Sequence, residues 1–134
     1  MRAFVHVDVF VYKYVYVNDY DYDNPMIYEL RIYWAEPGRA DDVNARFRDH
    51  TRRLFAKHNM GMVGFWTPKP RTDDTGDLVY ILIHESEEAM AASWAAFRAD
   101  PEWQKARDAS EVNGKIVAKG TSQVLLPTDY SALQ

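Results

Sequence analysis

Three polar side chains of one short stretch could do chemistry together. Glu29, Arg31 and Tyr33 occupy alternate positions in IYELRIYW, and alternate residues of a β-strand lie on the same face. An arginine can bind a carboxylate or another anion through parallel hydrogen bonds, and a glutamate can act as a base or as a hydrogen-bond acceptor. The same spacing also suits a structural Glu–Arg ion pair, satisfied across an interface. Both interpretations stay open at this point.

The histidines provide one candidate for proton transfer. His50 falls seven residues after Val43 and four before Leu54, which predicts a place on the inward face of a helix or at its margin. There it could act as a catalytic base, or it could be an ordinary core or interface residue. His58 ends the same helix, where we expect it to interact with the last helical carbonyls.

We expect no metal site. His50 and His58 are eight residues apart, which is not the spacing of a helical ligand pair, and no nearby pair of carboxylates completes a ligand set. His84 follows an apolar run and is expected to face solvent, and His6 belongs to a separate N-terminal segment.

Large aromatic residues could wall a binding site for a flat ligand. Trp66 and Trp94 are candidates for ligand contacts beside Arg31 and Tyr33, and Trp103 has a similar setting. Aromatic residues at strand and helix periods are also typical core residues, so the pattern fits both interpretations.

Hydrophobic periodicity predicts the elements that position these residues. An alternating pattern indicates a strand from 26 to 34, and a 3.6-residue pattern indicates a helix over 39–58. Two apolar runs joined by RTDDTGD predict an antiparallel hairpin, and Ser86 and Asp100 are suitable N-cap residues. The order βαββαβ predicts an α+β ferredoxin-like plait, in which two helices cover one face of a four-stranded antiparallel sheet. The remaining predicted elements are strands over 60–70, 78–85 and 115–127 and a helix over 86–112 that restarts at 100.

The other face of this sheet is expected to be an interface. In the strand over 78–85, apolar residues occupy both faces, although a face in contact with water should be polar. A large apolar patch usually marks an interface, and a symmetric homodimer is the commonest solution. We therefore expect two sheets to pack together, with Glu29, Arg31 and Tyr33 pointing into the space between them.

Composition excludes several classes of function. The chain has 134 residues and a net charge of -4, without a basic block that could neutralise nucleic-acid phosphates. It has no cysteine, which excludes disulfides and thiolate catalysis, and no apolar run of the roughly 20 residues that span a bilayer. No signal or transit peptide is recognisable, so we expect a cytoplasmic protein.

The first 25 residues differ from the rest. They alternate valine with aromatic and acidic residues and end in the turn-rich NDYDYDNP. Three interpretations compete: an extra edge strand, a disordered tail, or translated upstream sequence with Met26 as the true start. The third is favoured, because the domain over 26–134 is expected to be complete without this segment.

Three motifs carry a resemblance to a known family. The stretches MIYELRIYWAEPGR, HTRRLFAKHNMGMVGFW and DPEWQKARDAS resemble a bacterial NIPSNAP domain over residues 26–131. The resemblance implies the dimeric α/β-barrel superfamily, in which two plaits join their open faces. It implies no cofactor, since haem-degrading relatives would present an axial histidine where this chain has Arg107.

Two hypotheses for function follow. The first is a homodimeric module that binds a small molecule or a partner and has no catalysis of its own. The alternative is a cofactor-independent monooxygenase or isomerase acting on a small aromatic or ketone substrate, with Glu29 or His50 as the base and Arg31 stabilising the anion. A raised pKa of the glutamate would be its signature. A third possibility, a scaffold role, would leave no cavity.

Overall fold

The structure, a computed structural model, describes residues 25–134. The N-terminal segment over 1–25, with His6, lies outside the described residues except for Pro25. The three interpretations of that segment therefore stay predictions.

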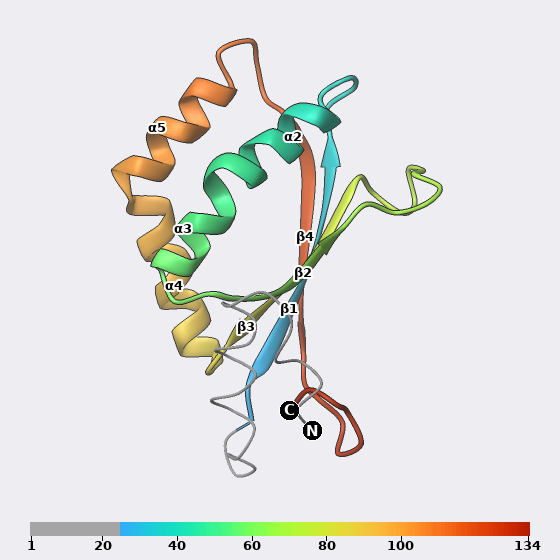
Figure 1. Cartoon of the computed structure of the whole chain (residues 1–134), viewed down its shortest axis with the longest axis vertical. Helices are drawn as coiled ribbons and strands as arrows, with labels where there is room; N and C mark the ends of the chain where they lie inside the picture. The colour runs from blue at the N-terminus through green and yellow to red at the C-terminus, as the bar shows by residue number, and fades with distance from the viewer. Residues whose placement is uncertain (1–24) are drawn as a thin grey trace.

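Four antiparallel strands form one sheet in the order β2-β3-β1-β4 (Figure 1). β1 (Ile27–Ala35) and β3 (Leu78–His84) are central, and β2 (Gly61–Trp66) and β4 (Val117–Leu125) are the edges. The predicted hairpin between β2 and β3 is present. The predicted βαββαβ order and the four-stranded antiparallel α+β sheet are confirmed.

The first helical region is interrupted. α2 (Ala40–Arg46) leads into a π-helical turn, η2 (Phe47–Thr51), and then into α3 (Arg52–Lys57), where an unbroken helix was expected. A π turn holds more residues than an α turn, so it rotates the following side chains. Thr51 consequently takes the inward position and is buried, whereas His50 is exposed. The prediction that His50 lies on the inward face or its margin was wrong for this reason.

The second helical region begins and restarts at the predicted caps. α4 (Glu87–Ala99) starts after Ser86, whose Oγ accepts the backbone N–H of Ala89 at 3.0 Å. α5 (Pro101–Ser110) starts after Asp100, whose side chain accepts the N–H of Glu102 at 2.8 Å. Both caps satisfy N–H groups that have no partner inside the helix. The backbone of each cap residue is extended, so the chain changes direction at Ser86 and at Asp100.

All helices lie on one side of the sheet, and the main core lies between the two layers (Figure 1). Tyr80 of β3 is fully buried at its centre. Rings from β1, β2 and the first helical region surround it at centroid distances of 5.2 to 5.8 Å. Such aromatic pairs contribute about 0.5–1.5 kcal/mol each beyond simple burial. These rings belong to Tyr33, Phe47, Phe55 and Phe65.

β1 turns its polar face toward the helices. The indole N–H of Trp94 in α4 donates to Glu29, and the ring of Tyr33 lies 5.7 Å from that of Phe47. Glu29, Arg31 and Tyr33 therefore do not point to the open face, and that expectation was wrong. Alternation in the sequence separates the two faces of a strand, but it does not determine which face packs against the helices. A charged face can be buried there when donors on distant elements form hydrogen bonds with it.

The open face of the sheet carries apolar side chains. Leu30 and Ile32 of β1 alternate with the helix-facing residues and are half-buried, and Ile81 of β3 lies on the same side. After β4 the chain folds back over one end of this face, where Tyr28 donates a hydrogen bond to the carbonyl of Gln134 at 3.2 Å. No helix within residues 25–134 is long and apolar enough to cross a membrane.

Candidate functional site

Glu29 is a buried carboxylate with four hydrogen-bond donors. Oε1 accepts from Trp94 Nε1 at 2.8 Å and lies 2.9 Å from His84 Nε2. Oε2 accepts from Arg31 Nη1 at 2.8 Å and from Ser122 Oγ at 2.7 Å. Each carboxylate oxygen thus has two partners, which uses the hydrogen-bonding capacity of the group. Because an ionised carboxylate only accepts, Nε2 of His84 carries the proton in this pair.

These donors keep Glu29 ionised. Burial favours the neutral acid and would raise its pKa, but the hydrogen bonds from His84, Ser122, Trp94 and Arg31 together outweigh burial and lower the pKa to about 2. A raised pKa was the expected signature of a catalytic base, and the shift is in the opposite direction. At neutral pH this carboxylate is a poor proton acceptor.

Arg31 is held by its neighbours on β1 and α4. Its Nη2 donates to Tyr33 Oη at 3.2 Å, and its guanidinium carbon lies 4.3 Å from the centre of the Trp94 ring. Tyr33 Oη in turn accepts from Tyr80 Oη at 3.0 Å. Both terminal nitrogens of Arg31 are therefore engaged within the protein.

A cleft of about 260 Å³ opens beside Arg31, between the sheet and the helices. Its volume is slightly below the roughly 300–1,000 Å³ that is usual for ligand sites. Thr51 and aromatic rings from β1 and both helical regions form part of its wall. These rings belong to Tyr33, Phe47, Phe55, Trp94, Phe97 and Trp103.

Four arginines complete the wall of the cleft, and no acidic residue among residues 25–134 lines it. Arg46 pairs with Glu111 at 3.0 Å, and its guanidinium carbon lies 5.0 Å from the centre of the Trp103 ring. Arg107 pairs with its neighbour Asp108 at 3.0 Å. The four are Arg31, Arg46, Arg98 and Arg107.

Two guanidinium groups of the cleft retain a buried donor without a partner. Nε of Arg31 and Nε of Arg46 are both inaccessible and make no hydrogen bond among the described residues. Arg46 is the more deeply buried residue, at 7% exposure. A buried donor left unpaired costs about 1–3 kcal/mol, more when it belongs to a charged group.

The structure brings together some of the predicted site residues and separates others. Arg31, Tyr33 and Trp94 line one cleft. Glu29 accepts a hydrogen bond from Arg31 but does not itself line the cleft. His50 is exposed, and Trp66 is 48% exposed at the end of an edge strand. Neither residue lines the cleft, so their roles in catalysis or binding stay predictions.

Two other histidines lie next to carboxylates. His84 is only 2% exposed, because its ring is turned to Glu29, so the prediction that it faces solvent was wrong. His58 is the C-cap of α3, and its backbone N–H donates to the carbonyls of Leu54 and Phe55 at 3.1 Å, while its ring lies 2.7 Å from Asp100 Oδ2. Hydrogen bonds from Lys57 and His58 hold the pKa of Asp100 well below its usual range. Within residues 25–134, no cluster of three or more His, Asp or Glu could hold a metal ion.

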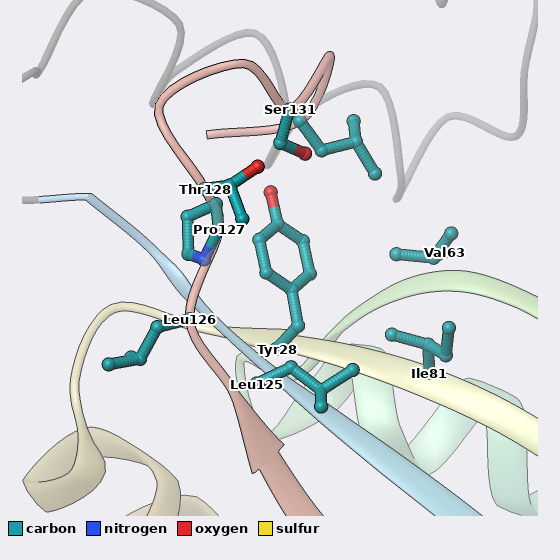
Figure 2. Close-up of a pocket in the computed structure, with 9 residues that line it drawn as sticks. Tyr28, Val63, Ile81, Leu125, Leu126, Pro127, Thr128 and Ser131 are labelled. Carbon is teal, nitrogen blue, oxygen red and sulfur yellow. The ribbon is translucent and has the colours of Figure 1, made fainter.

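A second, apolar hollow of about 350 Å³ lies on the open face (Figure 2). Tyr28 stands in it between the strands and the C-terminal segment, and Figure 2 shows Pro127, Thr128 and Ser131 forming one side. Burial raises the pKa of Tyr28 to about 12. This hollow lacks the charged groups of the cleft on the helix side.

The cleft also contains residues that the sequence did not single out as ligand contacts. Arg46 follows the buried Val43 by three residues, so an arginine at a core-facing helical position was a usable signal. Ser122 lies in a strand of exposed residues and gave no such signal. Arg98 is exposed and reaches the cleft only because α4 passes over β1.

Comparison with known proteins identifies the relatives of this chain. The model of the NIPSNAP family matches residues 28–132. No curated protein matches the chain.

Solved structures with the same fold include two bacterial NIPSNAP proteins. A NIPSNAP family protein from Agrobacterium tumefaciens has a TM-score of 0.70 at 21% identity, over 81% of this chain and 99% of that chain. An uncharacterised NIPSNAP-like domain protein from Burkholderia xenovorans has a TM-score of 0.67 at 22% identity, over 81% and 90%. A putative antibiotic biosynthesis monooxygenase from Bacteroides thetaiotaomicron is more distant, with a TM-score of 0.52 at 18% identity, over 78% and 90%. At these identities the similarity shows the fold alone.

Proposed function

The chain belongs to the NIPSNAP family, and from this premise we propose that it is a homodimeric protein that binds a small molecule in the cleft between its sheet and its helices. One observation carries the proposal: aromatic rings and guanidinium groups converge on a single cleft. Apolar walls with a few well-placed polar groups are typical of ligand sites. A pure scaffold would have no need of such a cleft.

The open face of the sheet supports the dimer. Leu30, Ile32 and Ile81 are apolar and incompletely buried in one copy of the chain. Packing against a second copy would remove this surface from water, at about 25 cal/mol for each Å² buried. A two-fold axis through the face would make it self-complementary.

The enzymatic alternative is not favoured. A general base needs a free lone pair within reach of its substrate, and the oxygens of Glu29 already accept from four groups. His50 is exposed and does not line the cleft. The two candidate bases therefore do not converge on one substrate position.

Indole N–H signals in ¹H–¹⁵N NMR spectra test the binding proposal. The chain has four tryptophans, of which Trp94 and Trp103 line the cleft and Trp34 and Trp66 do not. A fragment library should contain compounds that shift the Trp94 and Trp103 signals and leave the other two unchanged. A library without such compounds would contradict the proposal.

Sedimentation equilibrium tests the dimer. At micromolar concentration we expect twice the mass of the 15.6 kDa chain. A stable single subunit would contradict the homodimer without bearing on the cleft. A cytoplasmic location also belongs to this proposal, and fractionation of the native cells would test it.

A further inference from the structure

The charge of the cleft narrows the class of ligand. Its four arginines bring four positive charges, and three of them are paired with the carboxylates of Glu29, Glu111 and Asp108. The fourth, Arg98, has no ion pair among residues 25–134. Since the carboxylates stand outside the lining, the surface that a ligand would meet is positive.

The arginines differ in what they can still donate. Arg31 has both terminal nitrogens bound, by Glu29 and by Tyr33. Arg107 places Nε and Nη2 on Asp108. Arg46 uses Nη1, for Ser110 and Glu111, and its Nη2 makes no hydrogen bond among residues 25–134. Arg46 and Arg98 therefore keep terminal nitrogens without a partner among residues 25–134, whereas Arg31, the residue that the sequence favoured, keeps none.

The apolar part of the cleft lies beside these donors. The guanidinium of Arg46 lies over the ring of Trp103, and that ring lies 4.7 Å from the ring of Phe97 at an interplanar angle of 34°. Arg98 lies over the ring of Trp94, at 5.5 Å. An anion bound by the arginines would thus bring the rest of its molecule against flat aromatic walls.

We propose that the cleft binds a carboxylate on a small, flat, apolar body, with Arg46 and Arg98 as the residues that hold the carboxylate. This inference rests on the proposed ligand-binding function and specifies its ligand. A carboxylate supplies an acceptor for Nη2 of Arg46, which makes no hydrogen bond among residues 25–134, and its two oxygens match the planar fork of a guanidinium. The limited volume of the cleft excludes a large ligand.

Calorimetric titration with three probes tests the proposal on the full-length protein. The probes are 2-naphthoate, its neutral counterpart 2-naphthamide, and inorganic phosphate, which has the charge without the apolar body. We expect 2-naphthoate to bind at least tenfold more tightly than either of the others, because hydrogen bonds to charged groups are roughly twice as strong as neutral ones.

Arginine variants assign the donors. Arg98→Gln removes an exposed side chain without hydrogen-bond partners in the described part of the chain, so the fold should be unaffected. We expect it to weaken 2-naphthoate binding roughly tenfold and to leave 2-naphthamide binding unchanged. Arg46→Lys keeps the charge but removes the guanidinium fork with its Nη2, and it should weaken 2-naphthoate binding in the same way, with folding checked by circular dichroism. Arg71→Gln, on the exposed loop after β2, removes the same charge outside the cleft and should have no effect.

The outcomes separate the two proposals. Equal binding of 2-naphthoate and 2-naphthamide, or an Arg98→Gln variant that binds 2-naphthoate like the unaltered protein, would overturn the carboxylate assignment and leave ligand binding in place. If neither naphthalene probe binds and no fragment shifts the Trp94 and Trp103 signals, both the carboxylate assignment and the ligand-binding function are overturned.

Discussion

The indole nitrogen of Trp94 lies 2.8 Å from a carboxylate oxygen of Glu29, although 65 residues separate them in the chain. This hydrogen bond joins the first part of β1 to the middle of α4, and so ties the sheet to the helical layer beside the cleft. The guanidinium of Arg31 lies over the face of the same indole ring. The position of Arg31 therefore depends on a charge that the helix helps to hold.

The substitution Glu29→Gln should destabilise the protein. It removes the negative charge that balances Arg31 in a buried setting, and breaking a buried ion pair costs about 3 kcal/mol. Urea denaturation followed by circular dichroism would measure the loss. Glu85→Gln, one residue beyond β3 and exposed, should change the stability by less than about 0.5 kcal/mol. Equal effects of the two substitutions would contradict a stabilising role of the hydrogen bonds around Glu29.

Glu29 should also make stability depend on acid pH. Its pKa is about 2 in the folded protein against an ordinary 4.5, so its contribution is complete above pH 4.5 and is lost as the pH falls toward 2. This difference corresponds to about 3 kcal/mol. Between pH 5 and pH 2, the unaltered protein should lose more stability than Glu29→Gln does. Parallel profiles would show that Glu29 titrates normally.

A charge on the open face should separate the proposed dimer without unfolding the chain. Leu30→Glu places a carboxylate at the centre of that face, where one copy leaves room for it and a second copy would bury it unpaired. Sedimentation equilibrium should then give the mass of one subunit, with an unchanged far-ultraviolet spectrum. Val112→Glu, at a residue 77% exposed after α5, is the matched control and should remain dimeric.

Gly76 should tolerate a side chain less well than Gly38. Both have positive φ, 74° and 75°, so alanine carries the same backbone strain at each. A Cβ at Gly76 would come within 2.6 Å of the side chain of Ile32, whereas a Cβ at Gly38 meets nothing within 4 Å. Thermal unfolding should show a cost of about 1 kcal/mol for Gly38→Ala and a larger one for Gly76→Ala. Equal losses would mean that the hairpin loop moves aside freely.

Sequence patterns were sufficient for the elements and their order, because periodicity and capping are local properties. Alternation marked Glu29 and Arg31 as neighbours on one face, and Ser86 and Asp100 as helix starts, and the structure contains both features. These signals depend on residues within a few positions of one another.

Properties that depend on distant residues were not predictable in the same way. The direction of the polar face of β1 depends on Trp94 and Ser122, which lie 65 and 93 residues farther along the chain. The position of His50 depends on a change of helical period that leaves no mark in the hydrophobic pattern. The available donors of Arg46 became visible only when its contacts with Ser110 and Glu111 were known.

The π turn at Phe47–Thr51 has a consequence for how this chain should be aligned with others. A π turn of this kind allows a regular helix to accommodate one additional residue. A homologue one residue shorter here could run as an unbroken helix and still present its equivalents of Leu54 and Phe55 to the core. A single-residue gap in a comparison of such proteins therefore belongs inside this turn, and not in the loops on either side.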